Sequence, residues 1–207
     1  MKDRFILFDF DGVIVDSFAP AFEVNKKMCP VMTEADYRRR FEGNINNWME
    51  IEIKHDERCR HDLDFFTEYI PKMKDIVTFE EMSEIVKDLA KSYNLIIISS
   101  TLTLLIDELL KRNNLSEYFM EIMGNDIHTS KIEKIKMVFS KYNIGSKDCV
   151  FITDTLGDIR EASHSGVGAI AVSWGFNTKE TLSKGNPYKI VEKPEELTSA
   201  ISSYFTK

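Results

Sequence analysis

The sequence predicts an α/β protein in which a parallel β-sheet carries helices on both faces and a small helical module is inserted into the chain. Short apolar runs rich in Ile, Val and Phe recur at Phe5–Asp9, Leu95–Ser99, Cys149–Thr153 and Ala169–Ser173. Uninterrupted runs of this length suit strands that are buried on both faces. From Asn94 onward the runs alternate with helical patterns, and this alternation is typical of a parallel sheet.

The first predicted strand, Phe5–Asp9, leads into an acidic turn. Asp9 closes the apolar run, and Asp11 follows after the single residue Phe10. Gly12 suits the tight backbone of such a turn, because glycine adopts left-handed conformations at little cost. We therefore expect both carboxylates to lie at the end of this strand.

The segment between the first and second strands shows helical patterns and no convincing strand. Its helical cues lie at Thr33–Phe41, Asn46–Ile70 and Thr78–Tyr93. The last of these opens on Thr78 with Glu81 three residues later, a pairing that predicts a capping box. We therefore expect a helical domain at residues 18–74, inserted into a core domain made of residues 1–17 and 75–207.

Two amphipathic helices are expected in the second half of the chain. Each carries its apolar side chains at helical spacing along one stripe, as a helix packed on a sheet requires. The two stripes lie in residues 101–115 and 131–144 and consist of Leu102, Leu105, Ile106, Leu109 and Leu110, and of Ile132, Ile135, Met137, Val138 and Tyr142.

Composition and charge narrow the class of protein. The chain has 207 residues, of which 43% are hydrophobic and 29% charged, as in a globular protein with one sizeable core. Its formal net charge of −7 disfavours a broad nucleic-acid or anionic-membrane surface, so we predict neither partner. No run approaches the roughly 18 apolar residues of a membrane span, and the start lacks a signal-peptide pattern, so we predict a cytoplasmic location. Nothing in the sequence indicates an oligomeric state.

The cysteines and histidines show no metal-site spacing. Cys149 lies inside an apolar run, as a small apolar residue would, and Cys29 and Cys59 stand apart from each other. We predict structural roles for these three cysteines. Surface or local hydrogen-bonding roles are expected for the histidines, which are His55, His61, His128 and His164.

Polar side chains follow the predicted strands, where an open parallel sheet binds its ligands. These residues are Asp9 and Asp11 after the first run, Ser99 and Ser100 after the second, and Thr153 and Asp154 after the third. Bringing Asp9 and Asp154 together in a semi-buried crevice is costly unless a cation neutralises them. Oxygen ligands at this density suit Mg²⁺, which pairs with one or two carboxylates and a phosphate. We therefore predict Mg²⁺ as the cofactor.

The two acids of the first turn suit a two-step displacement. Asp9 lies where its carboxylate can attack an electrophile, and attack on a phosphoryl group would form an aspartyl-phosphate. Asp11 can then protonate the leaving alkoxide and deprotonate the incoming water.

Four segments in order resemble the motifs of the haloacid dehalogenase superfamily. They are DFDGVIVDS, the serine after LIII, the lysine in TSKIEKIK, and TDTLGD. The resemblance runs from Phe5 to about Asp158 and continues to Val172, and phosphoglycolate-phosphatase-like members are similar in overall pattern. Four ordered motifs at strand or helix ends are far more specific than a lone D-x-D. The resemblance implies a Rossmann-like core and, for the inserted helices, a type 1 helical cap.

The resemblance implies roles for the four acids. Asp9 would be the nucleophile and a metal ligand, and Asp11 the general acid/base, with its main-chain carbonyl on the metal. Asp154 would be the third metal contact and Asp158 the supporting acid of the metal site. Thr153 stands where the family commonly has glycine. The larger threonine side chain would crowd the metal without removing a ligand.

The resemblance also implies which residues hold the phosphoryl group. Ser99, with Ser100 beside it, matches the hydroxyl that binds a phosphoryl oxygen. Lys131 matches the lysine that steadies the nucleophile and the transferring charge, and Lys134 is the alternative.

The cap of such proteins lowers a loop toward the active site. Arg40, Gly43 and Asn44, in RRRFEGNINNW, match that loop and are candidate substrate contacts.

The resemblance also bears on the reaction. Asp11 matches the second acid of the phosphatase-like members, which the dehalogenases lack, so it favours phosphoryl transfer over dehalogenation. The predicted function is thus Mg²⁺-dependent hydrolysis of a small phosphorylated metabolite, with the compound itself left open. The alternatives are a phosphomutase or pyrophosphatase of the same superfamily, or a noncatalytic binding module with the same fold.

Overall fold

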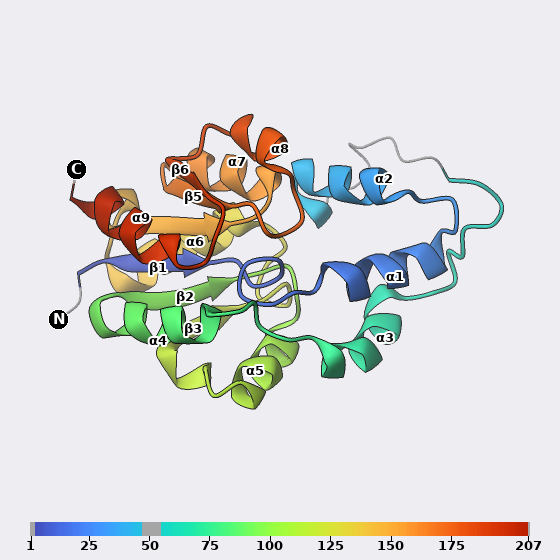
Figure 1. The fold of residues 1–207 in the computed structure, drawn as a ribbon, viewed down its shortest axis with the longest axis horizontal. Coiled ribbons are helices and arrows are strands. Elements are labelled where there is room, and N and C mark those ends of the chain that lie inside the picture. Colours follow the sequence, from blue (N-terminus) through green and yellow to red (C-terminus); the bar gives the residue numbers. More distant parts are fainter. Residues whose placement is uncertain (1–2, 47–54, 207) are drawn as a thin grey trace.

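The computed structural model describes residues 3–46 and 55–206, and the strands among these residues form one parallel sheet (Figure 1). The strand order is β3-β2-β1-β4-β5-β6. The strands are β1 (Phe5–Phe8), β2 (Asn94–Ile98), β3 (Phe119–Met123), β4 (Cys149–Thr153), β5 (Gly168–Val172) and β6 (Lys189–Val191). The predicted parallel α/β fold is confirmed.

Helices precede, follow and connect the strands. They are α1 (Phe18–Met28), α2 (Glu34–Arg39), α3 (Phe65–Tyr69), α4 (Met82–Ser92), α5 (Thr103–Arg112), α6 (Lys131–Tyr142), α7 (Leu156–His164), α8 (Lys179–Ser183) and α9 (Glu196–Phe205). Short 3₁₀ turns lie at Arg40–Glu42, Ile70–Asp75, Ser116–Tyr118 and Ser146–Asp148. Within the described ranges, no helix is long and apolar enough to cross a membrane.

The side chains of β1 alternate between two hydrophobic clusters, one on each face of the sheet. Ile6 and Phe8 belong to the cluster that includes buried residues of α4, α5 and α9. Phe5 and Leu7 belong to the cluster that includes α6, α7 and α8. Because successive strand residues point to opposite faces, β1 is covered on both sides, as its uninterrupted apolar run predicts.

Two strands were not predicted. The edge strand β3 (FMEIM) contains a glutamate and is only partly buried, and the edge strand β6 is three residues long. Neither contains an apolar run of the kind that marks a fully covered strand. β3 pairs with β2, and β6 pairs with β5. These pairings depend on tertiary structure, so the local sequence does not predict the two strands.

The expected capping box at Thr78 and Glu81 is wrong. Thr78 instead pairs with Val15 in an isolated antiparallel bridge, and the Phe79 N–H donates to the Ile14 carbonyl at 3.0 Å. These bonds hold the chain extended, so α4 begins at Met82. Glu81 precedes it in the left-handed region, with φ 66° and no side-chain cap.

The helix expected within Asn46–Ile70 is largely wrong where the structure describes it. Residues 47–54 lie outside the described ranges, and residues 55–64 are not helical. Helix α3 begins only at Phe65, where the Asp64 side chain caps it by accepting the Thr67 N–H at 2.8 Å. The expectation at Thr33–Phe41 is confirmed by α2, which has a capping box formed by Thr33 and Asp36.

Only part of the stripe predicted for α6 is buried. Met137 is 40% exposed, whereas Ile135 and Val138 are buried as expected. Two lysines, Lys131 and Lys134, occupy the rest of the buried face. Buried lysines beside apolar residues indicate that this end of α6 serves the site described below.

Helices α1, α2 and α3 lie together at one end of the molecule, to the side of the sheet (Figure 1). The chain enters this group after Ser17 and rejoins the sheet domain near Thr78. We call the group formed by residues 18–46 and 55–75 the cap. Its treatment as a separate domain at residues 18–74 stays a prediction. Cys29 and Cys59 form a disulfide within the cap, and Cys149 is buried in β4 as a free thiol.

Candidate active site

The polar residues predicted to gather at the strand ends do so where the strand order reverses. Strand β1 lies between β2 and β4, so the chain builds the sheet on one side of β1 with β2 and β3 and on the other side with β4, β5 and β6. Asp9 follows β1 and Asp154 follows β4, and both side chains are buried. This is the position at which open parallel sheets bind ligands.

The Asp9 carboxylate is held by one main-chain donor and one cation. The Phe10 N–H donates to Oδ1 at 2.8 Å, and Lys131 Nζ lies 2.8 Å from Oδ2. Burial raises the pKa of Asp9 well above its ordinary value, and the Lys131 charge opposes that rise. Lys131 therefore favours the ionised carboxylate that a nucleophile needs.

Lys131 joins two carboxylates. It is the first residue of α6, and its Nζ also lies 2.6 Å from Asp158 Oδ2, an oxygen that accepts a further hydrogen bond from Thr153 Oγ1 at 2.8 Å. Burial alone would lower the pKa of Lys131, but Asp158 and Asp9 together raise it. Burial favours a raised pKa for Asp158, yet Lys131 and the hydrogen bonds bring it below the ordinary value. These contacts favour the charged forms of both Lys131 and Asp158.

Lys134 points to different partners. Its Nζ donates to the Ser99 carbonyl at 2.6 Å and to the Gly124 carbonyl at 3.3 Å, and the side chain is fully buried. It therefore ties together the loops that follow β2 and β3. Of the two lysines considered for the phosphoryl group, Lys131 is the one in contact with Asp9.

Asp154 has one oxygen bound and one free. The Phe176 N–H donates to Oδ2 at 2.6 Å, while Oδ1 is buried and has no hydrogen-bond partner among the described residues. Burial raises the pKa of Asp154 to about 7. A buried, unpartnered carboxylate oxygen close to a second carboxylate fits a hard cation. Asp9 and Asp154 could therefore hold Mg²⁺.

Gly12 packs directly on Asp154. It has φ +73°, and a Cβ atom there would lie 2.1 Å from Asp154 Oδ2. The left-handed turn expected at this glycine is present, and no larger residue fits it without displacing the carboxylate.

Asp11 lies between the sheet domain and the cap. Thr101 Oγ1 donates to its Oδ2 at 2.7 Å, and the Tyr69 hydroxyl approaches its Oδ1 at 3.5 Å. Ser99 is buried next to this pair, and its Oγ accepts the Thr101 N–H at 3.0 Å. That bond uses an acceptor site of the hydroxyl and leaves the Ser99 proton free to donate to a ligand.

A cavity of about 310 Å³ lies over these residues. Its lining includes the predicted site residues Asp9, Asp11, Ser99, Ser100, Lys131 and Asp158 and the predicted substrate contacts Arg40, Gly43 and Asn44. Aromatic side chains of the cap, including Tyr37, Phe41, Phe65, Phe66 and Tyr69, complete the wall. Asp154 is not part of this wall.

The three predicted cap contacts have different surroundings. Arg40 donates from Nη1 to Asn25 Oδ1 at 2.6 Å, and its Nε is buried with no hydrogen-bond partner in the described ranges. Asn44 donates to Glu161 Oε1 at 3.0 Å and so binds the cap to α7. Gly43 meets α7 through its main chain. Among the described residues, Arg40 thus keeps a buried side-chain donor without a partner.

A model of the haloacid dehalogenase-like hydrolase family matches residues 6–172. The chain belongs to this family. The match extends from β1 to β5 and includes the cap and every predicted site residue. The resemblance drawn from the four motifs is confirmed.

Curated members of the haloacid dehalogenase-like hydrolases resemble the chain along nearly its whole length. A protein named phosphoglycolate phosphatase from Synechococcus elongatus is 23% identical, covering 95% of this chain and 96% of its own. One of the same name from Psychrobacter arcticus is 23% identical, covering 90% of each chain.

Solved structures share the fold. A haloacid dehalogenase-like family hydrolase from Streptococcus pneumoniae has a TM-score of 0.82 at 20% identity, covering 97% of this chain and 100% of its own. A hydrolase from Pseudomonas syringae has a TM-score of 0.80 at 17% identity, covering 97% and 98%.

Three residues of the site were not found from the sequence. Thr101 follows Ser99 and Ser100 in a run of hydroxyl residues, which was a usable signal. Nothing in the local sequence marks the Tyr69 hydroxyl as a partner of Asp11. Glu161 accepts the Lys131 N–H at 3.1 Å as well as the Asn44 amide, a contact between segments far apart in sequence.

Proposed function

We propose that this haloacid dehalogenase-like hydrolase is a Mg²⁺-dependent phosphatase acting on a small phosphorylated metabolite. The observation that carries the proposal is the buried 2.8 Å contact between Lys131 and Asp9 at the switch point of the sheet. It favours ionisation of a carboxylate that burial would otherwise neutralise. The curated relatives named phosphoglycolate phosphatase support the same class of reaction.

Asp9 attacks the phosphorus atom through a carboxylate oxygen, and the bond from phosphorus to the leaving alkoxide breaks. Asp11 gives its proton to that alkoxide and becomes a carboxylate. Asp11 then takes a proton from a water molecule whose oxygen attacks the aspartyl-phosphate. The bond between phosphorus and Asp9 breaks, and inorganic phosphate leaves.

The surrounding residues position these groups. Thr101 and Tyr69 orient the Asp11 carboxyl, while Lys131 and the Ser99 hydroxyl donate to the transferring phosphoryl oxygens. Mg²⁺, when bound by Asp9 and Asp154, would neutralise charge on the phosphoryl group. Asp158 holds Lys131 and completes the surroundings of the metal site.

The cavity favours a small substrate that carries a second anionic group. A volume of about 310 Å³ is at the lower end for ligand sites. Arg40 lines it with an unpartnered Nε, and burial lowers the pKa of this guanidinium. A carboxylate on the substrate would use that donor in a charge-assisted hydrogen bond. We therefore place phosphoglycolate first among the candidate substrates.

The test is release of inorganic phosphate from p-nitrophenyl phosphate and from a panel of phosphorylated metabolites. Activity should require Mg²⁺, disappear with EDTA, and disappear in the Asp9→Asn variant. Asp16→Asn, which changes an exposed acid on the same segment, is the matched control and should retain activity. Undiminished turnover in the Asp9→Asn protein would overturn the proposal. Phosphoryl transfer to a sugar hydroxyl without phosphate release would indicate a mutase instead.

A further inference from the structure

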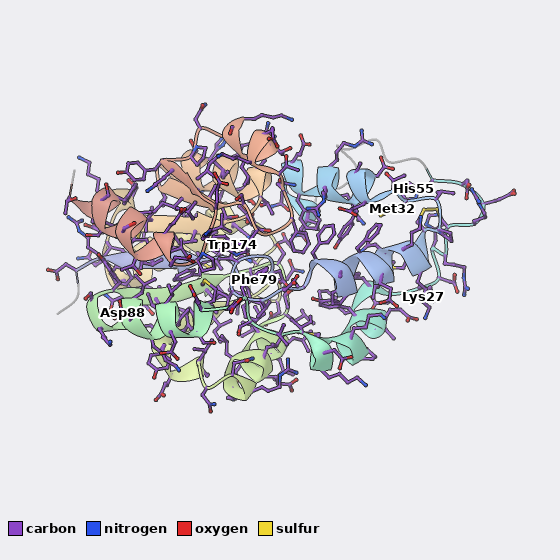
Figure 2. All side chains as sticks on the ribbon, viewed as in Figure 1. Lys27, Met32, His55, Phe79, Asp88 and Trp174 are labelled. Atoms are coloured by element: carbon purple, nitrogen blue, oxygen red, sulfur yellow. A yellow bond between two sulfur atoms is a disulfide. The ribbon has the colours of Figure 1, made fainter. Side chains whose placement is uncertain are left out.

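A cluster of soft ligands lies in the cap, away from the site of the proposed phosphatase. Cys29 follows the last residue of α1, and Cys59 lies in the loop before α3, with the two Cα atoms 4.1 Å apart. Cys29 Sγ is 3.7 Å from His55 Nδ1, and the potential ligand atoms of Cys29, His55 and Cys59 all lie within 4.8 Å of one another. His55 stands at the end of the cap farthest from the sheet, beside the disulfide (Figure 2).

Main-chain hydrogen bonds hold this cluster together without the disulfide. The Arg60 N–H donates to the Met28 carbonyl at 2.6 Å, which joins the neighbour of Cys59 to the neighbour of Cys29. The Cys59 N–H donates to the Asp56 carbonyl at 3.0 Å, closing a turn that begins next to His55. The three side chains would therefore stay close after reduction.

We propose that Cys29, His55 and Cys59 form a Zn²⁺ site when the two cysteines are reduced. Two thiolates and one imidazole are the ligands that Zn²⁺ prefers over hard cations such as Mg²⁺. Zn–S and Zn–N bonds of about 2.3 and 2.1 Å in a tetrahedron place sulfur and nitrogen about 3.6 Å apart. The 3.7 Å between Cys29 Sγ and His55 Nδ1 matches that edge.

The site is open to solvent on the side of His55, and a second histidine lies near it. Cys29 and Cys59 are buried, whereas His55 is exposed and closes the cluster toward solvent. The His61 ring lies 6.0 Å from the His55 ring, centroid to centroid, and is also exposed. His61 or a water molecule completes the tetrahedron.

The redox step that opens the site needs an external reductant. A phosphine takes up the oxygen of one water molecule, and the two hydrogens of that water convert the disulfide into two thiols. Binding of Zn²⁺ then releases one proton from each thiol. The cytoplasmic location predicted from the sequence would favour the reduced pair.

The metal would connect two walls of the cavity. Helix α1 supplies Ala21, Asn25 and Met28 to the lining, and α3 supplies Phe65, Phe66 and Tyr69. Zn²⁺ would bind the end of α1 to the loop that leads into α3. The proposal concerns binding in the cap and is independent of the phosphatase reaction.

The experiment measures zinc in protein purified with a phosphine reductant, dialysed against metal-free buffer and reloaded with Zn²⁺. We expect about one zinc per chain, and Co²⁺ in its place should show thiolate charge-transfer and tetrahedral d–d absorption. Cys59→Ser and His55→Ala should lose this binding. His55 is exposed, so its replacement leaves the fold intact. Cys149→Ala, which removes the third cysteine, is the matched control and should bind zinc like the parent.

Two further arms separate the possible outcomes. Asp9→Asn should retain the zinc, because the proposed ligands lie outside the catalytic site. Oxidation to the disulfide before loading should abolish it. The proposal fails if the reduced parent binds no zinc at micromolar concentrations, if the disulfide survives reduction in the folded protein, or if Cys59→Ser binds zinc as tightly as the parent.

Discussion

A Cβ atom on Gly157 would lie 2.2 Å from the carbonyl oxygen of Gly43, so α7 and the cap meet here backbone to backbone. Two hydrogen bonds fix the same contact. Asn44 donates to Glu161 at 3.0 Å, and Arg160 Nη1 donates to the Glu42 carbonyl at 2.6 Å. The position of the cap over Asp9 therefore depends on the absence of a side chain at position 157.

We expect Gly157→Ala to reduce kcat/KM by roughly tenfold to 100-fold, because the new methyl group pushes the cap loop away from α7. Small displacements of positioning groups have effects of this size. The backbone of Gly43 cannot move aside as a flexible side chain could. Steady-state kinetics with a small phosphate ester, and a melting curve to confirm folding, check the prediction.

Gly145→Ala is the matched control for this substitution. Gly145 has φ −124°, and a Cβ atom there would meet only Asp148 Oδ2, at 3.9 Å. This variant should retain the parental kcat/KM within about twofold. Equal kinetics in the two alanine variants would show that the contact between Gly157 and Gly43 does not position the cap.

A second prediction concerns Lys131, which lies between Asp9 and Asp158. Lys131→Met should lower kcat by roughly 100-fold or more, since it removes a cation from both the nucleophile and the transferring phosphoryl group. Lys136→Met on the same helix changes an exposed lysine paired with Glu133 and should be neutral. Rates measured at saturating Mg²⁺ test this, and a Lys131→Met enzyme with parental kcat would contradict it.

The sequence predicted the parts of the site that come from strand ends. Asp9 and Asp154 could be placed because an apolar run predicts a buried strand. The polar residues that directly follow the run must then lie at the end of that strand. Lys131 could be placed only through the motif resemblance, since a lysine at a helix start is ordinarily solvated. Lys131 is buried because the tertiary structure places Asp158 next to it, and this contact cannot be seen in the sequence.

The cap was less predictable than the sheet. Its boundaries at residues 18 and 74 stay a prediction, and the helix expected across residues 55–64 is absent. An acidic side chain in that segment bonds to a nearby main-chain group, since Asp56 accepts the Arg58 N–H at 2.9 Å, and such bonds compete with helix formation. The approach of Cys29 to Cys59 also depends on tertiary structure, and their separation of 30 residues gave no local signal.

A third prediction concerns substrate choice through Arg40. Arg40→Met should raise KM for phosphoglycolate by roughly tenfold to 100-fold, the effect expected for losing hydrogen bonds to a charged group. It should change KM for p-nitrophenyl phosphate, which has no carboxylate, by much less. Arg39→Met is the control, because Arg39 is half-exposed and pairs with Asp36 on the cap surface. An equal rise in KM for phosphoglycolate and for p-nitrophenyl phosphate would show that Arg40 does not bind the substrate carboxylate.

The last prediction is a pH dependence of stability that arises from Lys134. Burial, assisted by the Lys131 charge, lowers the pKa of Lys134 to about 8 in the folded protein. In the unfolded chain the same group has a pKa of about 10.4. Between these values the unfolded chain binds a proton that the folded protein does not. The contribution of Lys134 to the free energy of unfolding therefore rises as the pH increases from 8 toward 10, by at most about 1.4 kcal/mol per pH unit.

Urea unfolding of the parent and of Lys134→Met at several pH values between 8 and 10 isolates this effect. Other titrating groups are common to both proteins, so the difference between the two free energies of unfolding reports Lys134 alone. We expect that difference to move in favour of the parent as the pH rises, by on the order of 1–2 kcal/mol across the interval. Lys136→Met, which replaces an exposed lysine, should show no such trend. If the difference for Lys134→Met stays constant with pH, the buried ammonium keeps its proton throughout, and the carbonyl oxygens of Ser99 and Gly124 are enough to hold it charged.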